Sequence, residues 1–174
     1  MATNLEFIKS ETGTSVATLS ITNCFSDNYD VYAIIMGNSD IAADGGFFRY
    51  RFLDSGGSVI SAAEYDNAGL RLNAAAAFAE SRSTNETYMS GISSSTGALT
   101  AEGGTAITYV FNPYDSSSYT FTLTQSVNAN GSSSLQGFKF INVHKSAEQI
   151  TGFHILSDPS RTFETVEFSV YGVK

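Results

Sequence analysis

The chain has 174 residues and a formal net charge of −8, from 17 acidic and 9 basic side chains. This balance argues against direct nucleic-acid binding, which needs a concentrated Lys/Arg footprint, and the nearest basic residues, Arg49, Arg51 and Arg71, form no stripe. Hydrophobic residues make up 42% of the chain, which excludes a disordered tail and suits one domain over residues 1–174.

The sequence also shows no signal peptide, no membrane-spanning helix and no pair of cysteines that could form a disulfide. The opening "MATNLEFIKS" has no apolar segment of the kind found in signal peptides, and no run approaches the ~20 apolar residues of a membrane helix. We therefore expect synthesis in a cytoplasm, no membrane partner, and a short N-terminal arm over about residues 1–10. Cys24 is the single cysteine, so no intrachain disulfide forms, and its position beside Phe25 indicates a small buried hydrophobe.

Alternation with a period of two recurs along the chain and predicts strands. Residues 14–22 place Ala17, Leu19 and Ile21 on one face, and residues 29–36 read as a strand covered on both sides. In "FFRYRFL", Phe48, Tyr50 and Phe52 alternate with two arginines. Further strands are expected within residues 106–112, 118–124, 137–143, 150–156 and 166–173.

Two of these segments carry a predicted phase. In "SYTFTLT" we expect Tyr119, Phe121 and Leu123 to point inward, with Thr120, Thr122 and Thr124 outward. In the last segment Val166, Phe168 and Val170 share a face. Phe163 is out of phase with them, which predicts a β-bulge near Glu164 and Thr165.

The segment over residues 69–83 breaks the alternation. Its four consecutive alanines favour helix, so residues 70–82 are either a short helix, an irregular excursion, or a small-residue strand packed closely against a neighbour. Turn residues occupy Asp54–Gly57, Asn112–Ser118 and Asn128–Ser134, and Asn130-Gly131 predicts a hairpin. The stretch Ser93–Gly104 reads as a long exposed loop. Together these features predict an all-β fold, an antiparallel β-sandwich of jelly-roll type.

Residues suited to chemistry are present but form no recognisable constellation. His144 and His154 lie on separate expected strands, without the clustered spacing of metal ligands. We expect His154 to be a partly buried structural residue and His144 to lie at a strand end. Glu164 and Glu167 are the best carboxylate pair, but at this spacing they face opposite ways unless a bulge intervenes.

Loop carboxylates and serines are weaker candidates. Asp44 and Asp54 look like turn aspartates that bond their own backbone, and calcium in the acidic loops stays an alternative. The serines lack the nucleophile-elbow motif, and "AEGGT" lacks the sequel of a phosphate loop. From the sequence we therefore expect no catalytic residue, no cofactor-binding residue and no metal ligand, and we expect that the protein is not an enzyme.

Aromatic side chains leave a sugar-binding role open. The chain holds nine tyrosines and 13 phenylalanines, without tryptophan. The tyrosines that flank turns are the ones expected to be exposed: Tyr29, Tyr32, Tyr65, Tyr88 and Tyr114. Most phenylalanines occupy inward phases.

The final segment, "ITGFHILSDPSRTFETVEFSVYGVK", resembles the closing segment of a group of small virion proteins of tailed bacteriophages, often marine ones. In that group a penultimate strand precedes a final strand ending in "LYGVK" or "LYGIK". Matching positions are Ile150, Phe153, Ile155, Leu156, Phe168, Val170 and Tyr171–Lys174. "FIKSETGTSVATLSIT", "YDVYAIIMGN" and "YVFNPYDSSSYT" also resemble this group, whereas "NAAAAFAE" departs from it.

The resemblance implies a non-enzymatic structural protein at the virion surface, and it transfers no individual binding residue. We expect decoration or stabilisation of the capsid exterior, because one compact domain lacks the shaft of a tail fibre. The expected partners are the major capsid protein and further copies of this chain, with a trimer expected by analogy. A tail-fibre or receptor-binding module that recognises host glycans is the alternative. A polysaccharide hydrolase is a third hypothesis.

Overall fold

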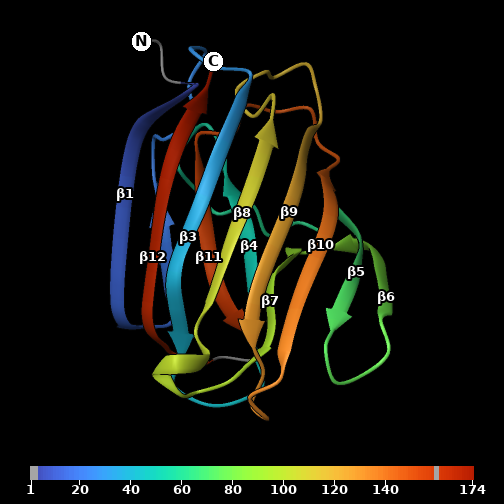
Figure 1. Cartoon of the computed structure of the whole chain (residues 1–174). Coiled ribbons are helices and arrows are strands. Elements are labelled where there is room, and N and C mark those ends of the chain that lie inside the picture. Colours follow the sequence, from blue (N-terminus) through green and yellow to red (C-terminus); the bar gives the residue numbers. More distant parts are fainter. Residues whose placement is uncertain (1–3, 159–160) are drawn as a thin grey trace.

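Two antiparallel sheets face each other in the computed structural model, which describes residues 4–158 and 161–174 (Figure 1). The larger sheet has the order β1 (Leu5–Val16), β12 (Phe163–Val173), β3 (Val31–Ile41), β8 (Gly104–Phe111), β9 (Thr120–Ala129), β10 (Leu135–His144), β5 (Tyr65–Asn73) and β6 (Ala79–Glu86). The smaller sheet has the order β2 (Thr18–Ile21), β11 (Gly152–Asp158), β4 (Gly46–Leu53) and β7 (Met89–Thr96). The predicted β-sandwich is confirmed, with a jelly-roll-like arrangement.

Helix contributes almost nothing to this fold. Within the described residues the helical structure is one 3-10 turn, η1, over Thr100–Glu102. No helix in this part of the chain has the length and apolar content needed to cross a membrane. The strands therefore carry the whole architecture.

The hydrophobic core lies between the two sheets. From the smaller sheet, Phe48, Tyr50 and Phe52 point inward and are at most 1% exposed, as their alternation predicts. Phe153 and Phe168 meet across the gap, with ring centroids 5.5 Å apart. Cys24 is buried beside Phe25 as expected, and burial raises the pKa of its thiol to about 12.

The final strand behaves as its sequence predicts. Val166, Phe168 and Val170 are buried on one face of β12. The register between β12 and β3 shifts on both sides of Thr165, which confirms the expected irregularity. β12 lies between β1 and β3, so both of its edges are paired. Gly172 admits a close approach, because a Cβ there would lie 2.6 Å from the Tyr29 ring.

The phase predicted for "SYTFTLT" is wrong. Thr120, Thr122 and Thr124 are buried on the inner face of β9, whereas Tyr119 and Phe121 are 46% and 48% exposed. The hydroxyls of Thr122 and Thr124 are hydrogen-bonded, which makes their burial tolerable, whereas Thr120 Oγ1 is buried without a partner among the described residues. Tyr50 Oη lies 2.7 Å from Thr122 Oγ1 and accepts a hydrogen bond of 2.8 Å from Asn142 Nδ2, and the hydroxyls of Thr108 and Thr124 are 2.9 Å apart.

The Ala-rich segment forms neither a helix nor a single strand. Residues 70–73 end β5, residues 74–78 form the connection, and residues 79–82 begin β6, so the segment is a hairpin at one edge of the larger sheet. The alanines thus lie mostly in a turn, where helix propensity has no influence. Asn73 Oδ1 accepts a hydrogen bond from the Ala75 amide there.

Three other boundaries differ from the expectations. The strand expected over residues 14–22 is divided between β1 and β2, which belong to different sheets. Residues 5–10 of the expected N-terminal arm lie in β1 and pair with β12, while residues 1–3 lie outside the described residues. The expected exposed loop over Ser93–Gly104 contains part of β7, and Thr96 and Glu102 are buried.

Candidate functional site

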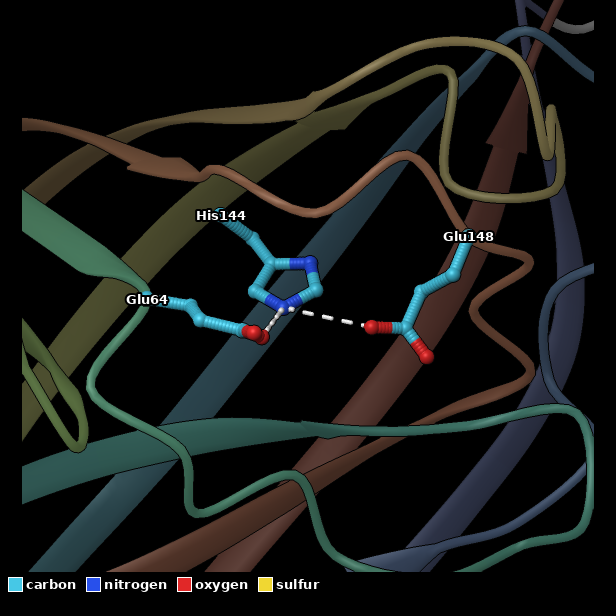
Figure 2. A group of neighbouring side chains, drawn as sticks. All are labelled: Glu64, His144 and Glu148. Atoms are coloured by element: carbon cyan, nitrogen blue, oxygen red, sulfur yellow. Dashed lines mark hydrogen bonds and ion pairs between the residues drawn. The ribbon is translucent and has the colours of Figure 1, made fainter.

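Among the described histidines, cysteine and acidic residues, one group of three side chains is close enough together to hold a metal ion: Glu64, His144 and Glu148. Figure 2 shows the Glu64 and Glu148 carboxylates directed at the same ring nitrogen of His144. From His144 Nε2 the distance to Glu64 Oε2 is 3.2 Å and to Glu148 Oε1 is 3.6 Å. The side chain of His144 is fully buried, whereas those of Glu64 and Glu148 are 38% and 34% exposed.

Sheet pairing explains how residues so far apart in sequence meet. His144 is the last residue of β10, as expected, and is paired with Tyr65 of β5, so Glu64 arrives immediately before that strand. The Lys145 amide donates to the Glu64 carbonyl at 2.9 Å. Glu148 follows in the segment between β10 and β11. The imidazole packs against the rings of Tyr65 and Phe52, at centroid distances of 4.9 and 6.1 Å.

One imidazole nitrogen and two carboxylates could together bind a divalent cation. The three ligand atoms lie within 4.8 Å of one another, and histidine nitrogen and carboxylate oxygen are both zinc ligands. A cation on Nε2 would, however, place the remaining ring proton on Nδ1. That nitrogen is buried and has no hydrogen-bond partner among the described residues, whereas a metal-bound histidine normally donates from its second nitrogen.

The geometry therefore favours a hydrogen-bonded brace over a metal centre. With the proton on Nε2, His144 donates to Glu64, and the buried Nδ1 carries only a lone pair, which is the less costly atom to leave unpaired. The brace connects the end of β10 with the residue before β5, Glu64, and with the segment that follows β10, which contains Glu148.

The other residues singled out in the sequence are dispersed. His154 is 9% exposed on β11, and its Nδ1 lies 2.7 Å from Ser20 Oγ, in the structural role expected of it. Glu164 and Glu167 both lie at exposed positions of β12. Asp54 Oδ1 accepts from the amides of Gly56 and Ser58, which confirms a turn aspartate. Asp44 instead accepts from the Ala98 amide, in another loop.

The tyrosines expected to be exposed divide into two groups. Tyr32 and Tyr65 are fully buried, so the expectation is wrong for them, whereas Tyr29, Tyr88 and Tyr114 are half-buried. Burial raises the pKa of the Tyr65 hydroxyl, which donates to the Ile60 carbonyl at 3.1 Å. Neither buried tyrosine is available to stack on a sugar.

An apolar surface covers the outer face of the larger sheet, on the side away from the smaller sheet. Across β8, β9, β10 and β5, the residues Tyr109, Leu123, Ile141 and Ala68 stand directly opposite one another in register. The neighbouring row contains Phe111, Phe121 and Val143. All of these residues except Tyr109 line a hollow of about 770 Å³, whose lining also includes Asp66 and Arg82. We call this surface the outer apolar face, together with Leu70, Leu72, Phe78, Val127 and Leu135.

A second hollow, of about 450 Å³, lies between the sheets at the opposite edge from β1. The smaller sheet ends at β7, and the larger sheet continues through β5 and β6 (Figure 1). Phe138 and Phe140 of β10 face this cleft, and Arg49, Arg71 and Tyr88 line it as well. Arg49 stacks on Tyr88, with its guanidinium carbon 3.8 Å from the ring centroid. The sequence did not indicate that Arg49 and Arg71 would share a cleft.

Comparison with known proteins identifies no family. No family model and no curated protein matches the chain. Among solved structures, a fructofuranosidase from Schwanniomyces occidentalis is 7% identical over 99% of this chain, with a TM-score of 0.26, and this chain spans 35% of that enzyme. An alginate lyase from Alteromonas sp. 272 is 9% identical, with a TM-score of 0.25, over 91% of this chain and 86% of that one.

Proposed function

We propose that this protein is a non-enzymatic structural protein of a bacteriophage virion, which associates with copies of itself and decorates or stabilises the capsid exterior. The observation that carries the assembly role is the outer apolar face. The resemblance of the final segment to phage virion proteins supports a location on the capsid, with the major capsid protein as the proposed partner.

The size of the outer apolar face supports association with another copy. Its most exposed large side chains, Leu70, Leu72, Phe78, Phe121, Val127, Leu135 and Ile141, are between 42% and 70% exposed. With about 150–250 Å² for a large aromatic side chain and somewhat less for an aliphatic one, they present on the order of 700 Å² in total, in two groups between which Gln125 and Lys139 lie. Apolar patches on monomers typically reach about 300–600 Å². A standard interface buries about 800 Å² per partner.

The distribution of polarity points the same way. β9 and β10 direct threonine and asparagine inward while Phe121 and Ile141 face outward, so the sandwich core does not use their apolar area. A chain that forms no intrachain disulfide gains stability when identical copies cover such surfaces. We therefore assign the outer apolar face to a second copy of the chain, in a closed assembly that we expect to be a trimer.

Light scattering on the purified protein tests the assembly. We expect a trimer, and we expect the double variant Phe121→Ser/Ile141→Ser to be a folded monomer. The matched control Glu164→Ser/Thr165→Ser changes two exposed positions of β12 and should remain assembled. A monomeric wild-type protein, or an assembly unaffected by the double variant, would contradict this proposal.

Antibody labelling of intact phage particles in the electron microscope tests the location. Label over the head supports capsid decoration. Label confined to the tail tip favours the second candidate function, a receptor-binding module that recognises host glycans. Absence of the protein from purified particles by mass spectrometry would overturn both locations. The cleft beside Arg71 is the observation that favours the second candidate.

A further inference from the structure

The cleft between the sheets combines aromatic walls with positive charge, in a protein whose net charge is −8. Three of its nine basic residues, Arg49, Arg71 and Arg82, line this hollow. Two carboxylates, Glu80 and Glu86, lie there as well, so the cleft as a whole carries one net positive charge. An electrostatic field of this sign favours an anionic ligand.

Arg71 is a basic residue of the cleft, and its guanidinium lacks an acceptor at Nε among the described residues. It stands opposite Phe138 on β10 and opposite Ala79 on β6, on the inner face of the sheet. Its Nε is buried and has no hydrogen-bond partner among the described residues. A buried guanidinium N–H without an acceptor is costly, and an oxyanion that accepts from Nε and a terminal nitrogen together would remove that cost.

The walls of the cleft suit a sugar ring. Phe140 lies between Gly69 and Gly91, where a Cβ on either glycine would approach the phenylalanine side chain to 2.5 Å, so the glycines permit the ring to occupy this place. Phe47, 37% exposed, lines the rim. The hydroxyls of Ser81, Ser83 and Ser90 add small polar groups to these apolar surfaces. Apolar walls with few polar groups are typical of sites for small ligands, and about 450 Å³ is within their usual range.

We propose that this cleft binds an anionic saccharide, with Arg71 pairing the carboxylate or sulfate of one sugar unit and the exposed ring of Phe47 contacting the sugar ring. This inference rests on the second candidate function and names its ligand class. Arg71, Phe138 and Phe140 lie on the inner face of the larger sheet, whereas the proposed assembly uses the outer apolar face.

Calorimetric titration with matched oligosaccharides tests the proposal. The probes are trisaccharides of galactose, glucose and mannose, each as the neutral sugar, the uronic acid and the sulfated sugar. We expect at least one uronic or sulfated member to bind at least about tenfold more tightly than its neutral counterpart, because a charge-assisted hydrogen bond is stronger than a neutral one. A preference for the uronic or for the sulfated member distinguishes the two sources of the oxyanion.

Variants then assign the effect to Arg71. Arg71→Gln should weaken binding of the preferred trisaccharide about 10- to 100-fold, and Arg71→Lys should fall between, because lysine keeps the charge without the bidentate geometry. Lys174→Gln removes the same charge at the other side of the larger sheet, on an exposed side chain paired with Glu6, and should bind within about twofold of the wild type.

An NMR measurement on the wild-type protein tests the role of Arg71 without depending on whether a variant folds. The Nε–Hε resonance of Arg71 should shift on addition of the preferred trisaccharide. Binding of neutral members only would overturn this inference and leave glycan recognition standing. No binding by any member would overturn both. Undiminished binding by Arg71→Gln, or an unmoved Arg71 resonance, would overturn the role of Arg71.

Discussion

Strands β12 and β9 belong to the same sheet, yet they use their two faces in opposite ways. β12 buries Val166, Phe168 and Val170 against the smaller sheet. β9 presents Thr120, Thr122 and Thr124 to the interior and leaves Phe121 half-exposed. On the same inner face of the sheet, a period of two is therefore compatible with an apolar core at β12 and with a largely hydrogen-bonded polar layer at β9. The phase of a strand depends on what its two faces contact.

The largest difference between the two strands should appear on truncating one phenylalanine in each. Phe168→Ala should lower the free energy of unfolding by about 3–5 kcal/mol, because it opens a cavity in the packed core. Phe121→Ala should cost less than about 1 kcal/mol for the isolated protomer, because half of that side chain is already exposed. Urea unfolding at protein concentrations below the dissociation constant of the assembly measures both free energies of unfolding. Equal costs would mean that β9 packs its aromatic side chain as β12 does.

A smaller effect is expected in the polar layer. Tyr50→Phe removes the hydroxyl shared by Thr122 and Asn142 and should cost about 1–3 kcal/mol of the free energy of unfolding. Burial raises the pKa of Tyr50 to about 12, so the hydroxyl stays protonated. Tyr119→Phe, which removes an exposed tyrosine hydroxyl, should change stability by less than about 0.5 kcal/mol. The layer would be dispensable if the two variants unfolded at the same urea concentration.

The smallest effect concerns His154 in the smaller sheet. Burial, and secondarily the positive charge of Arg51, lower its pKa below the ordinary 6.5. The unfolded chain then binds a proton at a higher pH than the folded protein does, so this contribution is complete above about pH 6.5 and is lost as the pH falls below it. Unfolding measured between pH 8 and 5 should show a shallower decline for His154→Gln than for the wild type. An identical decline would remove His154 from the pH dependence.

The parts of the fold that were predictable are those where apolar and charged residues alternate. In β4 the arginines between Phe48, Tyr50 and Phe52 exclude the opposite phase, and β12 is constrained in the same way. In "SYTFTLT" the alternative faces are threonine and aromatic, and both are compatible with a sheet interior when the hydroxyls find partners. The partners, Tyr50 and Asn142, lie on other strands, so local sequence does not reveal them.

The candidate site residues depend still more on distant pairing. Glu64 reaches His144 only because β5 pairs with β10, across 80 residues of sequence. Glu148, four residues after His144, is the one member of the brace with a local signal. Arg49 and Arg71 share a cleft because the smaller sheet stops at β7, a topological fact that no spacing between the two residues encodes.

The position of β12 also imposes an order on folding. A ribosome completes β1 and β3 long before β12, yet β12 is the strand that lies between them. Until it emerges, β1 has no neighbour in the sheet, and one edge of β3 stays open with its apolar side chains uncovered. Pairings between such remote segments are slow to form and leave the chain open to aggregation meanwhile. A nascent chain arrested before Phe163 should therefore be sensitive to proteases, and the emergence of β12 is the event that joins β1 to β3 in the larger sheet.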